Sequence, residues 1–321
     1  MPLVSVIVPV YKVELYIARF AHALFSQSLS DIEIIFVDDC SPDQSIAIIR
    51  EVLENYPQRK RQVTILKTPQ NGGLAKARLF GVKHAHGDYV YHLDSDDSIE
   101  IDACRLMYEM AVSNGFDVVT CDFRLLGLGE ERIHSQACEP GREVISILLG
   151  TVWGSVCSRM FKRELWDNMI PPHGDMWEDM VFTIQALANS KNVGYIPIPL
   201  YLYYRRPTSI SFTDGLQASL RRWTDIYANA QLIISFLNDR RFAGLNATDV
   251  IAFKYRCRSQ LLPYVHIPEY YKKWRNTFPE IDREYLWARG ISLEDKFWFV
   301  LIHLHLYHFV KMITGRLRRG N

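Results

Sequence analysis

Short apolar runs alternate with longer amphipathic segments over the N-terminal third of the chain. The apolar runs, rich in Val and Ile, predict strands at 3–10, 32–39, 62–68 and 88–94. The segments between them predict helices at 14–28, 44–55 and 74–85. This alternation is typical of an α/β domain, and runs that are apolar on both faces belong in a parallel sheet covered by helices. In such sheets ligands bind beyond the carboxyl ends of the strands.

Each predicted strand is followed by residues that suit a binding site or a turn. They are Pro9 and Tyr11, Asp38 and Asp39, Asn71 to Gly73, and Asp94 to Asp97. "VDDCSPD" also suits a turn that caps the helix near residue 44, and "NGG" also suits a flexible turn. Since the features lie at the same edge of one predicted sheet, we weigh them together.

The stretch "YHLDSDD" places Asp94, Asp96 and Asp97 within four positions after an apolar run. A helix cap needs one aspartate, and three so close together repel one another unless a cation is present. Carboxylate oxygens suit Mg²⁺ or Mn²⁺, and Mg²⁺ is usually held by one or two carboxylates together with substrate phosphates. The acidic cluster therefore predicts a divalent metal that binds a diphosphate.

The segments "VSVIVPVYKVELYI", "IIFVDDCSPD", "NGGLAKARLFG", "YHLDSDD" and "WED" resemble glycosyltransferase family 2 in order and spacing. The resemblance covers about residues 3–212. It implies the GT-A fold, an α/β nucleotide-binding domain with a DxD motif. It also implies inverting, metal-dependent transfer of a sugar from a nucleotide-sugar donor, commonly UDP-linked, to an acceptor hydroxyl.

On the donor side, the resemblance assigns roles position by position. Pro9 and Tyr11 resemble the residues that border the nucleotide base, and Asp39 resembles the carboxylate that accepts a hydrogen bond from uracil. Arg78 resembles the arginine that helps to hold the nucleotide. The family commonly has Asn after this arginine, whereas this chain has Leu79, so no polar contact is expected from that position.

The metal and the general base follow from the same resemblance. Asp94 resembles the DxD residue near the ribose and metal, and Asp96 the residue that coordinates the metal between the phosphates. Asp97 is expected to support the site or to cap the next helix. An acceptor hydroxyl must lose its proton during the attack, and Asp179 in "WED" matches the catalytic base of the family. An acidic first turn of a helix is the structural alternative for Glu178 and Asp179.

Two further segments have open interpretations. Trp153 is expected either to stack on a sugar face or to belong to the core. In "YLYYRRPTSIS", Arg205, Arg206 and Ser209 are expected either to form an exposed basic loop or to supply one residue that closes over the diphosphate.

Beyond residue 215 the chain becomes mainly helical in pattern, so we expect a GT-A domain at 1–214 and a helical extension at 215–321. The part from 271 to 321 has ten Lys and Arg against five Asp and Glu, whereas the whole chain is balanced at +1. With the aromatic run at 297–310, this basic end predicts peripheral membrane contact through 297–321, or packing on the protein or a second subunit.

Composition excludes several classes of protein. The balanced charge does not indicate a nucleic-acid partner. The six cysteines contain no CxxC pair, so the sequence indicates neither a zinc site nor a disulfide framework. The N-terminus reads as a strand rather than a signal peptide, and no run is long enough to span a bilayer. We expect a cytoplasmic enzyme. Its expected partner is a glycan or lipid-linked acceptor at the inner face of the membrane.

Three other functions are alternatives for a chain with these motifs. A Rossmann-type oxidoreductase would need GxGxxG after the first strand, where this chain has Pro9-Val10-Tyr11. A nucleotidyltransferase would also use paired carboxylates and Mg²⁺, but its Gly-rich basic loop after the first strand is missing. A non-catalytic module that binds a sugar nucleotide is the third alternative.

Overall fold

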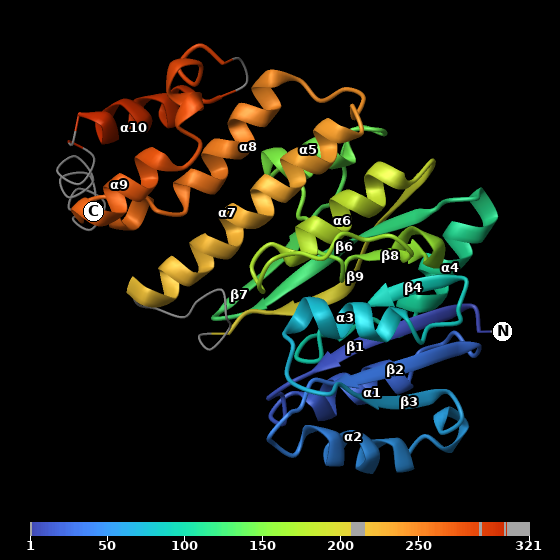
Figure 1. Ribbon diagram of the computed structural model, residues 1–321. Coiled ribbons are helices and arrows are strands. Elements are labelled where there is room, and N and C mark those ends of the chain that lie inside the picture. The colour runs from blue at the N-terminus through green and yellow to red at the C-terminus, as the bar shows by residue number, and fades with distance from the viewer. Residues whose placement is uncertain (1, 207–215, 289–290, 305, 307–321) are drawn as a thin grey trace. The chain divides into compact units, whose positions relative to one another are not determined.

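The computed structural model of the protein describes residues 2–206, 216–288, 291–304 and 306. The chain divides into two compact units, Met1–Gly215 and Leu216–Asn321 (Figure 1). The first unit is built around a mixed β-sheet, and the described part of the second unit is helical.

The sheet has the strand order β3-β2-β1-β4-β8-β6-β9-β5, with β7 paired to β6. Its strands are β1 (Val4–Val10), β2 (Ile32–Asp38), β3 (Val63–Lys67), β4 (Tyr89–His92), β5 (Ser98–Ile99), β6 (Val118–Gly127), β7 (Glu130–His134), β8 (Arg159–Lys162) and β9 (Val193–Tyr204). β3, β2, β1 and β4 run parallel, β8 is antiparallel to both β4 and β6, and β6 and β9 are parallel.

The four strands predicted from apolar runs are confirmed as β1 to β4. Every residue of β1 is buried, as are all but one of β2, because helices cover both faces of these strands. Val10 pairs with Asp38 in β2, and Asp38 pairs with Lys67 in β3, so these three strands end at one edge of the sheet. That edge carries the polar residues identified in the sequence.

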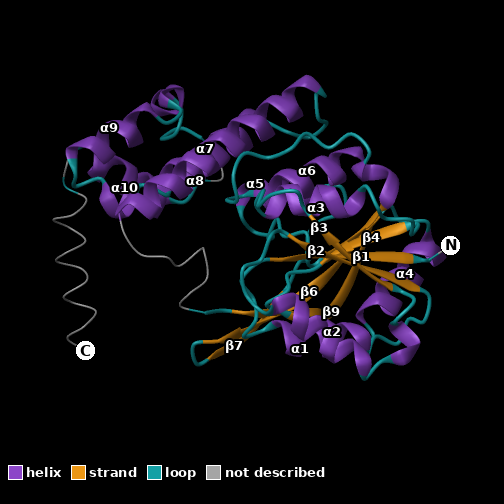
Figure 2. Ribbon diagram, turned by 60° about the horizontal axis from the view of Figure 1, so that its bottom comes forward, coloured by secondary structure: helices purple, strands orange, loops and turns teal. Residues whose placement is uncertain are grey.

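Helices cover the sheet in two layers (Figure 2). One layer contains α1 (Ile17–Phe25), α2 (Ser45–Glu54) and α4 (Ala103–Asn114); the other contains α3 (Leu74–Val82) and α6 (Glu178–Asn189), with α5 (Glu143–Leu149) beside α6. Gly81 lets α3 approach β1 closely, since a Cβ there would lie 2.5 Å from Cγ2 of Ile7. α3, which carries Arg78, therefore packs directly on the sheet.

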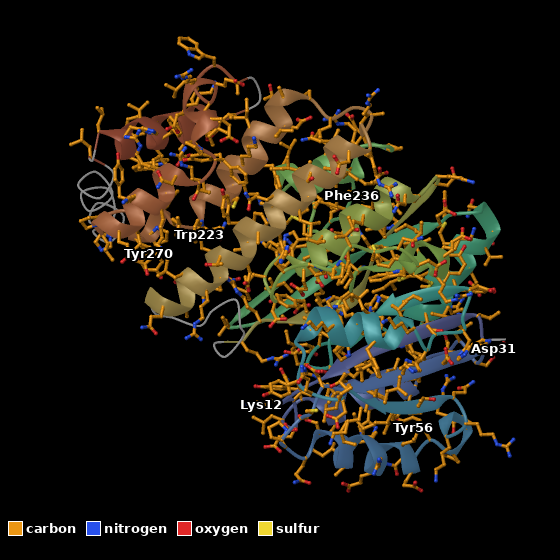
Figure 3. The ribbon with its side chains drawn as sticks, viewed as in Figure 1. Lys12, Asp31, Tyr56, Trp223, Phe236 and Tyr270 are labelled. Atoms are coloured by element: carbon orange, nitrogen blue, oxygen red, sulfur yellow. The ribbon has the colours of Figure 1, made fainter. Side chains whose placement is uncertain are left out.

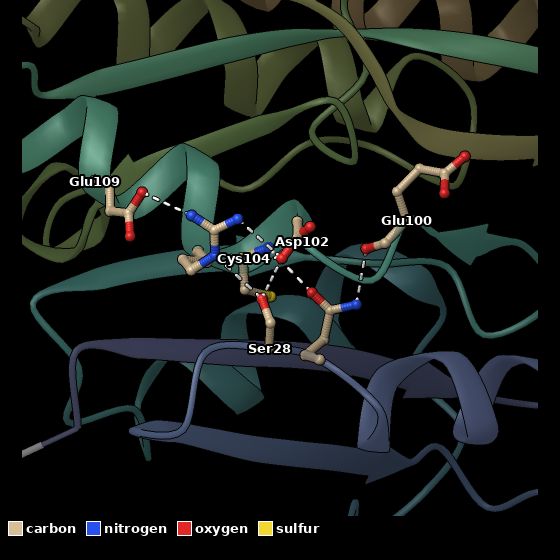
Figure 4. Close-up of polar contacts among 7 residues, drawn as sticks. Ser28, Glu100, Asp102, Cys104 and Glu109 are labelled. Atoms are coloured by element: carbon tan, nitrogen blue, oxygen red, sulfur yellow. Dashed lines mark hydrogen bonds and ion pairs between the residues drawn. The ribbon is translucent and has the colours of Figure 1, made fainter.

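A polar network ties the loop after α1 to the start of α4 (Figure 4). The Gln27 side chain donates to the carbonyl of Glu100 at 2.9 Å and accepts from the amide of Cys104 at 3.1 Å. Ser28 donates to the carboxylate of Asp102 at 2.6 Å. These bonds fix the chain that leaves the acidic cluster, so the cluster is anchored on its C-terminal side.

The second unit contains α7 (Leu216–Asp239), α8 (Ala247–Ser259), α9 (Pro268–Asn276) and α10 (Leu293–His303). Trp223, on α7, and Tyr270, on α9, are labelled in Figure 3. The buried rings of Trp274, Tyr285 and Phe299 form part of its core, with the centroids of Tyr285 and Phe299 4.5 Å apart. Among the described residues, no helix has the length and apolarity to cross a bilayer.

Candidate active site

Asp39 anchors the glycine loop to the end of β2. Its carboxylate is 3% exposed and accepts hydrogen bonds from the amides of Gly72, at 3.0 and 3.1 Å, and Gly73, at 2.9 Å. The hydroxyl of Thr68 donates a further bond at 2.8 Å. The sequence did not predict these contacts, which give Asp39 a structural role in shaping the N-terminus of α3.

Tyr11 lies where β1 ends, beside Asp39. The amide of Asp39 donates to the carbonyl of Val10 at 3.1 Å, and the Tyr11 side chain is 42% exposed. Lys12, labelled in Figure 3, has a φ of 55° and donates its amide to Oγ of Ser41 at 2.8 Å. This turn leaves the Tyr11 ring open to solvent, whereas Pro9 is buried within β1.

Arg78 joins two carboxylates that come from different parts of the chain. The Nη2 atom of Arg78 lies 2.9 Å from Asp94 at the end of β4 and 3.1 Å from Asp179 in the first turn of α6. The Arg78 side chain is fully buried. Burial lowers the pKa of Arg78, but Asp179 and Asp94 outweigh it and hold that pKa well above its ordinary value. Arg78 is therefore a permanent cation between the two aspartates.

Asp179 is the more accessible of the two carboxylates in the "WED" segment. Its side chain is 23% exposed, whereas Glu178 is buried. Burial raises the pKa of Asp179, Arg78 lowers it, and Asp94 raises it again, so that the net pKa lies above the ordinary value. The pKa of Glu178 is raised well above normal by burial and by the neighbouring Asp179. Both acidic residues do start a helix, but the contact with Arg78 places Asp179 beside Asp94.

Asp96 is bound by a cation from the end of β9. Nη2 of Arg206 lies 2.8 Å from the Asp96 carboxylate and donates to the Asp96 carbonyl at 2.5 Å. Arg19 on α1 donates to the same carbonyl at 2.8 Å. The two guanidinium groups stack on Tyr16 and Tyr204, at 3.8 and 3.6 Å respectively.

Sequence reasoning missed Arg19, Tyr16 and Tyr204. Nothing in the local sequence marks these residues, because their contacts join α1 to the end of β9. Of the two arginines expected near the diphosphate, Arg206 contacts the acidic cluster, whereas Arg205 forms a 3.5 Å ion pair with Glu130. Ser209 lies outside the described residues.

Asp97 supports the cluster from within. Its carboxylate accepts hydrogen bonds from the hydroxyl of Tyr201 and, at 2.8 Å, from the amide of Tyr204. Asp97 is 1% exposed, and burial, Asp96 and Asp94 together raise its pKa well above the ordinary value. The alternative that Asp97 caps the next helix is wrong, since α4 begins at Ala103 with Asp102 at its N-cap.

The residues at this edge of the sheet fit a divalent cation that takes most of its ligands from phosphates and water. Within the described ranges no group of three His, Cys, Asp or Glu residues is placed to hold a metal ion by itself. Asp96 already binds a cationic group, and burial and Asp94 raise its pKa, as expected where negative charge is in excess. Mg²⁺ needs only one or two carboxylates when phosphates and water complete its shell.

Trp153 is neither fully buried nor isolated. It is 40% exposed, and its ring lies 4.7 Å from Phe123 and 5.3 Å from His134 between centroids. Trp153 thus belongs partly to the core and partly to the surface, because its inner side packs on the sheet while part of the residue remains accessible.

At the edge where β1 and β2 end, buried Arg78 therefore joins Asp94 of the acidic cluster to Asp179 of α6. The model of the family "Glycosyl transferase family 2" matches residues 5–169. The glycosyltransferase EpsJ of Bacillus subtilis (strain 168) is 30% identical over 276 residues, which are 81% of this chain and 76% of that protein. The chain belongs to glycosyltransferase family 2, and it is a glycosyltransferase.

More distant relatives agree with this assignment. The glycosyltransferase GlyG of Streptococcus pneumoniae serotype 4 is 25% identical over 84% of this chain and 90% of that protein. The crystal structure of residues 1–349 of S. aureus TarS in complex with UDP has a TM-score of 0.64 and 20% identity, covering 99% of this chain and 92% of that one. The GT-A fold with a helical C-terminal region is confirmed.

Proposed function

We propose that the protein is an inverting, metal-dependent glycosyltransferase that moves a sugar from a UDP-linked donor to a hydroxyl of a glycan or lipid-linked acceptor. The observation that carries this proposal is the contact of Arg78 with both Asp94 and Asp179. Through it, the carboxylate suited to act as a base lies beside the cluster suited to hold the donor.

The donor lies along the edge formed by β1, β2 and β4. Tyr11 borders the nucleotide base, and Pro9 and Asp39, both buried, support this edge from beneath. Asp94 binds the nucleotide, and Arg78, whose side chain is fully buried, acts on the nucleotide by holding Asp94. Asp96 would hold a divalent ion, and a bound Mn²⁺ or Mg²⁺ supplies positive charge that stabilises the departing diphosphate. Arg206 contacts the Asp96 carboxylate directly, so Arg206 and the ion would share this carboxylate.

Asp179 acts as the general base. Its carboxylate accepts the proton of the acceptor hydroxyl while the acceptor oxygen bonds to the anomeric carbon and the bond from that carbon to the diphosphate oxygen breaks. The oxygen attacks opposite the leaving group, so a single displacement inverts the anomeric centre. Arg78 fixes the carboxylate through its 3.1 Å contact.

The names of relatives support the donor and acceptor classes. TarS has been crystallised with UDP-GlcNAc, and a mannosyltransferase from Pyrobaculum calidifontis with GDP-Man and Mn²⁺. A poly(ribitol-phosphate) beta-glucosyltransferase of Bacillus spizizenii is 29% identical over 59% of this chain and 30% of that protein. These support a nucleotide-sugar donor carrying a hexose or N-acetylhexosamine and a role in polysaccharide biosynthesis.

Cytoplasmic localisation and peripheral membrane contact through 297–321 belong to this proposal. Phe297 and Leu304 are 53% and 60% exposed, which suits an interfacial segment. Phe299 and Ile302 are buried, which favours packing for that side of α10. Residues 305 and 307–321 lie outside the described part of the chain.

Replacement of the base tests the proposal. We expect Asp179→Asn to lower the transfer rate by roughly 10²- to 10⁴-fold, the usual contribution of a general base, with UDP affinity unchanged. The rate is measured with a UDP-sugar panel and the affinity by calorimetry. Asp167→Asn, which alters an exposed carboxylate before α6, is the matched control. Equal losses of transfer and UDP binding in Asp179→Asn would contradict the base assignment.

A further inference from the structure

Four aromatic rings form a continuous cluster on one face of the sheet. Phe123 on β6 stacks with His134 on β7, with centroids 4.9 Å apart and an interplanar angle of 6°. Trp153, before β8, packs on both rings and lies 6.1 Å from Tyr203 on β9. We call these residues the Trp153 platform.

Strand register explains why these rings meet. Phe123 pairs directly with His134, and Leu125, two residues further along β6, pairs with Tyr203. Side chains two residues apart on a strand share a face of the sheet, so Phe123, His134 and Tyr203 project to the same side. Phe123 is 2% exposed and forms the base of the platform, whereas Trp153 is 40% exposed.

The exposed indole is held in a defined position. The amide of Trp153 donates to Oε1 of Gln136 at 3.2 Å, and the same oxygen accepts from buried Arg159 at 3.3 Å. Gly154 lets the chain pass close to α6, because a Cβ there would lie 3.0 Å from Cγ of Met180. A large aromatic ring that is both fixed and accessible is a feature of binding surfaces.

The platform adjoins both halves of the catalytic site. Gly154, next to Trp153, packs on Met180, which directly follows Asp179 in α6. On the other side, Tyr204, next to Tyr203 on β9, donates its amide to the Asp97 carboxylate at 2.8 Å. Burial and the charge of Asp97 contribute to a pKa of Tyr203 raised to about 12. Trp153 is thus linked to the proposed base through Gly154 and Met180, and to the acidic cluster through the neighbouring β9 residues Tyr203 and Tyr204.

The nucleotide end of the site lies elsewhere on the sheet. β4 and β8 separate β1 from β6, so β6, which carries Phe123 of the Trp153 platform, lies three strands, or about 14 Å, from β1, which ends just before Tyr11. A nucleotide base at Tyr11 and Asp39 therefore does not compete for Trp153. The platform lies on the acceptor side.

We propose that the exposed face of Trp153 binds a pyranose ring of the acceptor, with His134 and Tyr203 contacting its hydroxyl groups. This subsite rests on the proposed function and gives it an acceptor class, a saccharide rather than a bare lipid alcohol. The C–H face of a pyranose matches a flat apolar ring, and its equatorial hydroxyls need polar partners at the ring edge. Burial and Arg132 lower the pKa of His134, which keeps the imidazole neutral and able to donate and accept.

The test uses the full chain with UDP and Mn²⁺ bound, and the methyl glycosides of glucose, galactose and N-acetylglucosamine as probes. Saturation-transfer NMR measures glycoside binding, and calorimetry measures UDP binding. We expect at least one glycoside to bind, Trp153→Ala and Trp153→Leu to weaken it fivefold or more, and Trp153→Tyr to preserve it. Trp153→Leu retains apolar contact with Phe123, so it serves if the alanine variant does not fold.

Trp287→Ala is the matched control, because Trp287 is 83% exposed and lies in the second unit. It should leave both UDP and glycoside binding unchanged. Glycoside binding that is absent in the wild type, or equal in Trp153→Leu, overturns the acceptor subsite. Failure of UDP to bind the wild type instead contradicts the proposed function, so the two failures are distinguishable.

Discussion

Arg78 sets the charge balance of the site. One buried guanidinium faces Asp94 and Asp179, so the three groups together carry one net negative charge. A buried cation without these partners would be strongly unfavourable, and removing one partner from such a pair commonly costs about 3–5 kcal/mol. Arg78 therefore couples the position of Asp179 to the position of Asp94.

The pH dependence of transfer should report the environment of Asp179. Burial and Asp94 raise the pKa of Asp179 above its ordinary value despite Arg78, and the base works only when ionised. The rate should therefore fall as pH decreases through this raised pKa, and the fall should begin above the value of about 4 typical of aspartate. The measurement is kcat/KM against pH at saturating Mn²⁺. A rate that stays constant down to about pH 4 would contradict the assignment.

The sequence predicted which acidic residues lie at the sheet edge but not their partners. Asp39, Asp94 and Asp96 follow recognisable strands, so their placement follows from strand order. The glycine-loop amides on Asp39 and the guanidinium of Arg206 on Asp96 depend on distances between segments far apart in the chain. No local pattern encodes such distances.

The glycine loop before α3 requires a particular backbone conformation. Gly73 has φ of 84° and ψ of 168°, a region that is essentially restricted to glycine, and a Cβ there would lie 2.7 Å from Oδ1 of Asp175. Its amide also binds Asp39. We expect Gly73→Ala to lower the free energy of unfolding by about 1–3 kcal/mol and to weaken UDP binding.

Gly129→Ala is the control that separates the effect of backbone strain from the effect of a crowded Cβ atom at the site. Gly129 also has a positive φ, of 79°, but a Cβ there meets nothing within 4 Å. Urea unfolding should show a smaller loss of about 1 kcal/mol, and calorimetry should show unchanged UDP affinity. Equal UDP affinity in Gly73→Ala and the wild type would contradict a role for this loop in nucleotide binding.

The strands that were predicted share short runs rich in Val and Ile. β1, β2 and β4 are buried, whereas β3 lies at the end of the sheet and has no buried residue. β9 was not predicted, since Pro197 and Pro199 interrupt its sequence and proline disfavours a strand interior. The structure accommodates them at a register shift against β6, where the pairing moves from Cys121 with Ile196 to Asp122 with Pro199.

At the scale of the whole molecule, the balanced charge of the chain contrasts with a local excess of carboxylates. The protein carries a formal net charge of +1, yet Asp94, Asp96 and Asp97 lie together and meet only the side chains of Arg78 and Arg206 as charged partners among the ion pairs of the described residues. A divalent ion would relieve this excess of negative charge and would also offset the charge of a bound diphosphate. Metal and nucleotide should therefore bind together.

Calorimetric titration of UDP, with and without Mn²⁺, tests this account most directly when it is repeated on Asp96→Ala. We predict tight binding of UDP that requires both Mn²⁺ and Asp96, with weaker binding of GDP. UDP binding that is indifferent to Mn²⁺ and to Asp96 would mean that the acidic cluster holds no catalytic metal, and would contradict the proposed mechanism.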